Sequence, residues 1–273
     1  MPVRLDEFED QLPATSARAW RRRLAAREPL VGLWAVSGSA TATEILGRSG
    51  ADWLIIDVEH SPSTALSVQE QLRLLEAAPV FTVVRAGSKD PLELGRWLDL
   101  GARGLMIPMV ESGSEAEAIV AAVRYPPRGR RGVGGGFARA TRWTGVSDYL
   151  ARAEESFSII AQIETSRAID ALAEILAVDG IDAVFIGPAD LAASMGHLGQ
   201  PRHPDVRRHV QEAIALCAAR GVPVGVNAFA VEDAREYAAL GARLLAVGAD
   251  VTLLAHGSQS LVASMEASGA GRT

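Results

Sequence analysis

The chain has 273 residues, of which 48% are hydrophobic and 22% are charged, and its formal net charge is −6. This composition suits one large globular domain, and the acidic balance argues against a general nucleic-acid binder, which needs a basic surface. The charged start lacks the apolar core of a signal peptide, no apolar run is long enough for a membrane span, and the single cysteine, Cys217, fits a reducing compartment. We therefore expect a cytoplasmic protein that does not bind membranes.

The first 28 residues predict an extension with one helix, which Thr15 or Ser16 caps and which runs through Ala26. Residues 29–267 are expected to form one domain, and residues 268–273 a disordered tail.

Beyond this extension, short β-branched apolar runs alternate with longer helical patterns, which indicates successive βα units and a parallel sheet. Eight such units predict an α/β protein with a closed (β/α)8 TIM barrel rather than an open doubly wound sheet. The predicted strands are Val31–Val36, Trp53–Asp57, Phe81–Arg85, Gly104–Pro108, Ser158–Ile163, Asp182–Gly187, Val222–Asn227 and Leu244–Gly248. The helices predicted between and after them include Val68–Ala77, Pro91–Leu100, Glu115–Val123, Ser166–Leu176, Val206–Arg220, Val231–Leu240 and Leu253–Met265.

Polar side chains mark the C-terminal ends of several predicted strands, where barrel enzymes carry their sites. They are Asp57, Glu59 and His60 after the second strand, Arg85 at the end of the third, Gln162 and Glu164 at the fifth, and Asp190 after the sixth.

Glu164 and Asp190 stand out because they follow adjacent strands. Taken singly, each carboxylate could equally be a helix cap. Taken together, they have the pattern of two ligands for a hard divalent cation, with positions left for waters and a bidentate substrate. Arg85 would supply positive charge to an anionic substrate, and His60 would exchange protons near neutral pH.

Lys89 is the single lysine among 27 basic residues. A barrel enzyme that works through a Schiff base needs a lysine amine inside the barrel. Lys89 lies in a polar stretch before a helix, where a solvated side chain is the simpler interpretation, so covalent imine chemistry is not expected. His197 and His203 lack a cysteine or a third nearby histidine, so we do not predict a zinc site.

The full set of motifs resembles the class II pyruvate aldolases of the HpcH/HpaI type, the 4-hydroxy-2-oxoheptanedioate and 2-dehydro-3-deoxyglucarate aldolase family. Val58 departs from the glycine that this family usually has between the aspartate and the glutamate of the first motif. The matching runs are Trp53–Pro62, Val83–Arg85, Arg124–Pro127, Arg131–Gly134, Gln162–Glu164 and Phe185–Leu191.

This resemblance implies a reversible aldol reaction that joins or releases pyruvate, or hydroxypyruvate, and an aldehyde. It implies that Glu164 and Asp190 hold Mg²⁺, Mn²⁺ or Co²⁺, with no organic cofactor, and that His60 moves a proton at the C4 hydroxyl while Asp99 orients it. Asp57 and Glu59 would hold waters and the loop. The residues expected to bind the 2-oxo acid are Arg85, Gln162, Gly187, Pro188, Ala189 and Asp190.

The long segment Tyr125–Val146 has more glycine, arginine and aromatic residues than a simple connection needs. The resemblance implies that Val133, Phe137 and Arg139 reach a neighbouring subunit and line its aldehyde pocket in a homo-oligomer, expected to be a hexamer.

Two alternatives remain open. A lyase acting on CoA esters, of the malyl- or citramalyl-CoA type, would use a similar metal pair, but we find no basic cluster reserved for the CoA nucleotide. A catalytically silent barrel is the other alternative, and the complete set of His60, Arg85, Glu164 and Asp190 argues against it.

Overall fold

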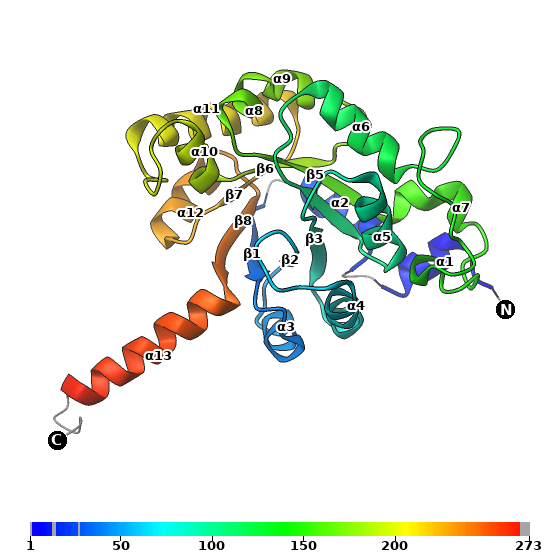
Figure 1. Ribbon diagram of the computed structural model, residues 1–273, viewed down its shortest axis with the longest axis horizontal. Coiled ribbons are helices and arrows are strands. Elements are labelled where there is room, and N and C mark those ends of the chain that lie inside the picture. The colour runs from blue at the N-terminus through cyan, green and yellow to red at the C-terminus, as the bar shows by residue number, and fades with distance from the viewer. Residues whose placement is uncertain (1, 13–14, 27, 268–273) are drawn as a thin grey trace.

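A closed barrel of eight parallel strands, paired in chain order, forms the centre of the computed structural model, which describes residues 2–12, 15–26 and 28–267 (Figure 1). The predicted TIM barrel is confirmed, and most strand boundaries agree within two residues. The strands are β1 (Leu30–Ala35), β2 (Trp53–Asp57), β3 (Phe81–Arg85), β4 (Gly104–Ile107), β5 (Ser158–Ile163), β6 (Ala183–Ile186), β7 (Val224–Asn227) and β8 (Leu244–Ala249).

Helices surround this barrel, and two precede it. Within the described residues, none of them has the length and apolar character of a membrane span. The α-helices are α1 (Leu5–Asp10), α2 (Ala17–Ala25), α3 (Ala40–Gly47), α4 (Ala65–Leu74), α5 (Pro91–Asp99), α6 (Gly113–Val123), α7 (Tyr149–Arg152), α8 (Ser166–Asp170), α9 (Leu172–Ile175), α10 (Pro188–Ser194), α11 (Pro204–Arg220), α12 (Val231–Ala239) and α13 (Asp250–Ala267). Short 3-10 helices are η1 (Leu75–Ala77), η2 (Arg139–Thr141) and η3 (Ala153–Ser156).

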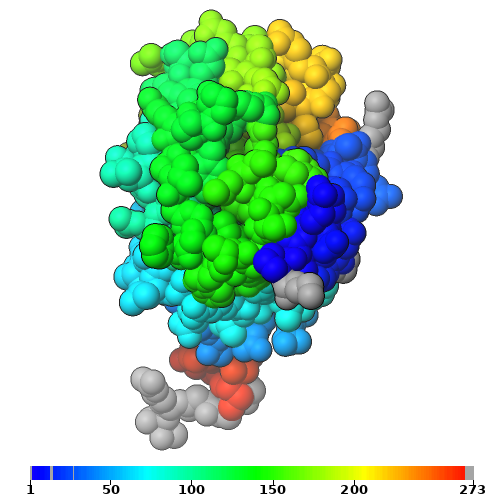
Figure 2. Space-filling view, turned by 90° about the vertical axis from the view of Figure 1, so that its right-hand side faces the viewer, coloured from blue at the N-terminus to red at the C-terminus, as the bar shows by residue number. Residues whose placement is uncertain are grey.

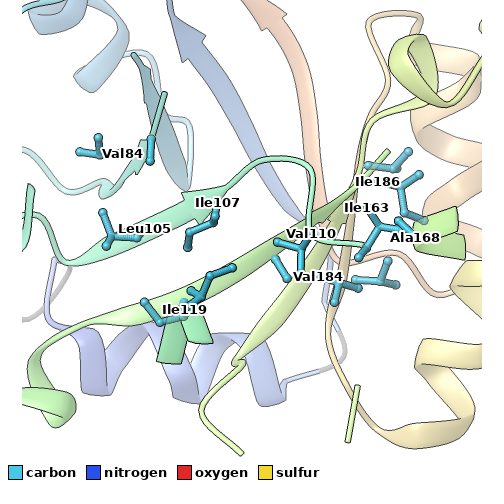
Figure 3. Packing of buried hydrophobic residues seen from close by; sticks show 14 of the residues in the cluster. Val84, Leu105, Ile107, Val110, Ile119, Ile163, Ala168, Val184 and Ile186 are labelled. Carbon is cyan, nitrogen blue, oxygen red and sulfur yellow. The ribbon is translucent and has the colours of Figure 1, made fainter. Parts of the chain in front are cut away.

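Alternation along the strands divides the core into two layers. In β2, Leu54 and Ile56 pack with the surrounding helices, whereas Trp53 and Ile55 belong to a second cluster that fills the barrel. Figure 3 shows part of the outer layer, where strand residues such as Ile107 and Ile163 meet residues of α6 and α8. The same period of two governs which polar residues at the strand ends face the barrel axis.

The N-terminal segment corrects the prediction of a single helix, because α1 precedes α2. Ser16 caps α2 as expected, with its side chain accepting a hydrogen bond from the Ala19 N–H. Trp20 of α2 stacks on Phe81 at the start of β3, with ring centroids 4.3 Å apart. It therefore closes the end of the barrel at which the strands begin. α1 packs against residues 146–153, as the dark-blue and green surfaces of Figure 2 show.

The last helix, α13, is longer than predicted and does not cover the barrel. It projects away from the other helices (Figure 1), and almost all of its residues are exposed. Its exposed apolar side chains include Leu254, Leu261 and Val262. The predicted tail, residues 268–273, lies outside the described residues. The segment predicted as one helix over Ser166–Leu176 is divided at Ala171 into α8 and α9.

Candidate active site

Strand register brings the predicted polar residues to one end of the barrel. Asp57 and Arg85 are paired neighbours at the ends of β2 and β3, two positions beyond the interior residues Ile55 and Val83. Gln162 stands two positions beyond the interior residue Ile160 in β5. Because side chains alternate, all three polar side chains continue the inward-facing rows.

Arg85 is held from three sides. Its Nε donates to Asp57 Oδ1 at 2.8 Å, and its Nη1 lies 3.0 Å from Glu59 Oε2. The guanidinium also lies 4.4 Å from the ring centroid of Trp34, whose indole N–H donates to Asn227. Sequence reasoning did not single out Trp34 or Asn227, although both occupy inward positions at strand ends. The buried guanidinium therefore has one orientation toward the mouth of the barrel.

Asp57 is buried and organises the loop after β2. Its carboxylate accepts the backbone N–H groups of Glu59 and His60 at 3.0 and 3.3 Å. His60 itself is exposed, and its Nε2 lies 3.7 Å from Glu59 Oε2. The loop thus presents an imidazole to solvent at the mouth while its backbone is tied to the barrel, despite the valine at position 58.

Glu164 is buried, and the contacts around it are close. Its Oε1 accepts the Met109 N–H at 2.8 Å, and its Oε2 accepts the Gln162 Nε2–H at 2.5 Å. A Cβ on Gly187 would come within 2.9 Å of Glu164 Oε2, so a larger residue here would displace this carboxylate. Burial raises the pKa of Glu164 to about 7, and the negative charges of Glu59 and Asp190 add to the rise.

The cap interpretations of the two carboxylates are wrong. Thr165 caps α8, with its side chain accepting the Ala168 N–H. Gly187 is the N-cap residue of α10, Pro188 follows it, and Asp190 lies in the first helical turn without a side-chain cap bond. Both carboxylates are therefore available at the mouth for another partner.

The charge balance of the cluster fits a divalent cation. Arg85 pairs with Asp57 and Glu59, and its charge also acts on Glu164. The negative charge of Asp190, which is exposed, acts on both Glu59 and Glu164. An excess of negative charge around a buried carboxylate such as Glu164 is unfavourable unless a cation or protons neutralise it. Within the described residues, the buried Oε1 of Gln162 also accepts no hydrogen bond, which leaves an acceptor free for a bound group or its water. Glu164 and Asp190 have the oxygen ligands that Mg²⁺ and similar ions prefer.

The raised pKa of Glu164 makes a prediction about metal-free protein. A carboxyl group whose pKa is about 7 when folded and about 4.5 when unfolded stabilises the fold at low pH, and this contribution is lost as the pH rises through 7. Metal-free Glu164→Gln protein should therefore be more stable than metal-free wild type at pH 8, by on the order of 3 kcal/mol. The difference should shrink toward zero near pH 4.5.

Denaturant unfolding in the presence of a chelator measures this difference at both pH values. Glu117→Gln, an exposed position on α6, is the matched control and should show no gain at either pH. An equal gain for Glu164→Gln at both pH values would show that the carboxyl is not buried as described.

Asp99 does not contact His60 within the chain. It lies at the C-terminal end of α5, where its Oδ1 accepts from Arg131 Nη2 at 2.5 Å. The resemblance implies that Asp99 orients the histidine, and within one chain the structure does not bring the two together.

The segment 125–146 divides into exposed and buried parts. Val133 and Phe137 are exposed, Phe137 by 92% of its surface, as a contact with a neighbouring subunit requires. Arg139 is buried, and its Nη2 lies 2.5 Å from Glu76 Oε2 of η1. The guanidinium of Arg139 is thus paired within its own chain, and its expected contact with a neighbouring subunit stays a prediction.

His197 and His203 lie together with a third candidate ligand, Asp205, whose Oδ2 is 3.7 Å from a nitrogen of each. The two rings stack face to face with centroids 3.6 Å apart, so their lone pairs point side by side rather than toward one point. His203 Nδ1 already accepts the Asp205 N–H as the cap of α11. These contacts support a structural role for the pair.

A closed barrel with a cluster of carboxylates, an arginine and a histidine at its mouth is the arrangement of an enzyme of the TIM-barrel class. Residues 30–257 match the family model described as HpcH/HpaI aldolase/citrate lyase. The chain belongs to this family. It is a carbon–carbon lyase of the aldolase type.

Three relatives illustrate the likeness. A 4-hydroxy-2-oxo-heptane-1,7-dioate aldolase of Salmonella dublin is 45% identical over 245 residues, which are 90% of this chain and 93% of that protein. The structure of an HpcH/HpaI aldolase/citrate lyase family protein from Burkholderia cenocepacia J2315 has 40% identity and a TM-score of 0.87, covering 91% of this chain and 99% of that one. The HpcH/HpaI aldolase from Desulfitobacterium hafniense DCB-2 has 30% identity and a TM-score of 0.81, covering 90% and 96%.

Proposed function

We propose that the chain cleaves 4-hydroxy-2-oxo acids reversibly to pyruvate, or hydroxypyruvate, and an aldehyde. The observation that carries this proposal is the cluster of Glu164, Asp190 and Arg85, in which the charges of Asp190 and of the buried Arg85 guanidinium act on the Glu164 carboxylate. The aldolase from Salmonella dublin is named for a substrate of this class and is similar over nearly its whole length.

Glu164 and Asp190 would hold Mg²⁺, Mn²⁺ or Co²⁺. An ion in that position supplies Lewis-acid stabilisation to the negative charge that develops on the keto oxygen of the 2-oxo acid. Gln162 would orient the substrate or its water through its free Oε1. The backbone N–H groups of Ala189 and Asp190, which follow Gly187 and Pro188 in the first turn of α10, would bind the substrate carboxylate.

Arg85 would donate to the same developing oxyanion. Its Nε is occupied by Asp57, and Trp34 covers one face, so the remaining N–H groups are pre-oriented. Such preorganised donors cost no reorganisation during the reaction.

His60 would take or return the proton of the C4 hydroxyl, since it is exposed at the mouth and able to exchange protons near neutral pH. Asp57 keeps the histidine loop in place, and Glu59 lies beside the imidazole. Because Asp99 is distant from His60 in its own chain, we propose that it acts on His60 of a neighbouring subunit.

We propose that the chain forms a homo-oligomer, specifically a hexamer, and two surface features support this assembly. Asp99, Gly134 and Phe137 line one surface hollow of about 440 Å³, so the segment proposed to line the aldehyde pocket and the proposed histidine partner share a face. The exposed apolar side chains of α13 form a second surface, and the exposure of such a surface to water is unfavourable. A neighbouring subunit would cover both surfaces.

The buried Cys217 fits the proposed cytoplasmic location.

Phe137→Ala should change the preference among aldehydes without affecting pyruvate C3 proton exchange. The phenyl ring is exposed in its own chain, so its loss costs the fold little, whereas a neighbour's pocket would lose one wall. The ratio of kcat/KM for two aldehydes of different size should shift by about 10-fold, the effect of one or two hydrophobic contacts. Leu198→Ala, which removes another largely exposed apolar side chain from a different loop, is the control. A fully active monomer in dilute solution would contradict this prediction.

A coupled assay for pyruvate, run on several 4-hydroxy-2-oxo acids and on malyl- and citramalyl-CoA, tests the function. Turnover of the free acids alone supports the proposal. Turnover of the CoA esters alone would favour the CoA-ester lyase, and no turnover of either would favour a silent barrel.

A further inference from the structure

Met109, which follows β4, has a backbone conformation that is unusual for its residue type. Its φ is +54°, in the left-handed region that residues with a Cβ seldom adopt. Such strain persists only where surrounding contacts hold it, and it is frequent at functional sites. The N–H of this residue donates to Glu164 Oε1 at 2.8 Å, so the unusual conformation aims a donor at a proposed metal ligand.

Contacts on the next peptide unit hold this conformation. The carbonyl oxygen of Met109 accepts from Lys89 Nζ at 2.8 Å, and the N–H of Val110 donates to the Gln162 carbonyl at 3.2 Å. These two bonds hold the peptide between Met109 and Val110 from opposite sides. The N–H of Met109 belongs to the preceding peptide, between Pro108 and Met109. With the following peptide fixed, the φ of Met109 sets the orientation of that preceding peptide and therefore the direction in which the N–H points.

Lys89 is suited to hold this peptide because its own position is secured. Its ammonium group also lies 2.9 Å from Glu115 Oε2 of α6, which in turn accepts the Glu111 N–H at 2.9 Å. Lys89 itself stands in the loop after β3, four residues beyond Arg85. The chain's single lysine thus connects the loops after β3 and β4 at the mouth of the barrel.

We infer that Lys89 is a positioning residue for the metal ligand Glu164, acting through the left-handed peptide of Met109. The inference rests on the proposed metal site. Without the ammonium group, Met109 relaxes toward a common backbone conformation, its N–H turns from Glu164, and the carboxylate loses the bond that fixes its orientation. Partners of this kind typically change metal affinity by about 10- to 100-fold. Because Lys89 is partly exposed, we expect the lower end, about 10-fold.

The first experiment measures Mn²⁺ binding to the full-length, metal-stripped protein by calorimetry. Lys89→Met should weaken binding about 10-fold, whereas Lys89→Arg, which keeps a cationic donor, should restore most of the affinity. Arg48→Met is the matched control, since it removes an exposed cation paired with Glu44 far from the mouth. Binding to Lys89→Met as tight as to wild type would overturn the inference. Loss of Mn²⁺ binding in Glu164→Gln tests the proposed metal site separately.

A second measurement needs no metal. Amide hydrogen exchange of a peptide containing Met109 should accelerate in metal-free Lys89→Met and remain slow in Lys89→Arg. Unchanged exchange in Lys89→Met would overturn the inference even if the metal site proved to be elsewhere.

A double-mutant cycle tests the role of backbone strain. Met109→Gly removes the penalty of a positive φ, so Lys89→Met should weaken Mn²⁺ binding less in that background than in wild type. An equal loss in both backgrounds would show that Lys89 supports Mn²⁺ binding without acting on the backbone of Met109 and would overturn the proposed route.

Discussion

Chelator treatment should abolish retro-aldol activity, and Mn²⁺, Co²⁺ or Mg²⁺ should restore it. Glu164 and Asp190 are the only side-chain ligands that we propose, so no other protein group would retain the ion. Glu164→Gln replaces a charged ligand by a neutral one of the same size, and its loss of Mn²⁺ affinity should exceed the roughly 10- to 100-fold effect of an outer-shell change. Activity should fall to background at metal concentrations that saturate the wild type.

Glu117→Gln on α6 is the control, since it removes an exposed carboxylate from outside the site. Calorimetric titration with Mn²⁺ and the pyruvate assay should be run on both variants. Full activity of chelator-treated protein, verified as metal-free by elemental analysis, would refute the metal mechanism. Retained binding with lost activity in Glu164→Gln would instead assign Glu164 to catalysis rather than to the ion.

Arg85→Lys should lose almost as much activity as Arg85→Ala, about 10²- to 10³-fold in kcat. The site uses the planar shape of the guanidinium. It donates through Nε to Asp57, lies over the Trp34 ring and still has N–H groups left for the substrate. A lysine ammonium can supply charge, but it cannot donate in fixed divergent directions while it stacks on an indole ring.

Arg73→Lys, an exposed position on α4, provides the matched control and should behave as wild type. Mn²⁺ affinity should be measured for each variant, because the prediction concerns the oxyanion and not the ion. Near-normal turnover by Arg85→Lys would mean that charge alone is sufficient and that another group stabilises the oxyanion.

The barrel and its chemically important strand ends could be predicted from local patterns. Each strand is a short apolar run, and several of them end in or near a polar residue. Alternation along β2 and β3 directs Asp57 and Arg85 inward, whatever the neighbouring parts of the chain do. Glu164 and Asp190 were found for the same reason, since strand order alone makes their strand ends adjacent. The structure then removed the cap alternative by showing Thr165 and Gly187 as the caps.

Contacts between residues distant in sequence could not be predicted in this way. The family resemblance led us to expect Arg139 at a neighbouring subunit, and no local pattern indicates that it pairs with Glu76 inside its own chain. Met109 gives no signal in the sequence, since a left-handed φ at a methionine arises from the bonds that Lys89 and Gln162 make to its neighbouring peptide. The helix period over Leu253–Met265 was correct, but periodicity does not say against which surface a helix packs.

The sequence by itself therefore determined the fold class, the inward rows of the strands and the two carboxylates that would hold the ion, because these follow from periods of two and of about 3.6 residues within single elements. Only the tertiary structure decided which side chains form contacts between different helices, strands and loops. It showed that Asp57 holds both Arg85 and the His60 loop, and that α13 leaves the barrel with its apolar side chains exposed. Those outcomes depend on distances across the barrel mouth. Closure of the barrel sets these distances, and no local sequence pattern encodes them.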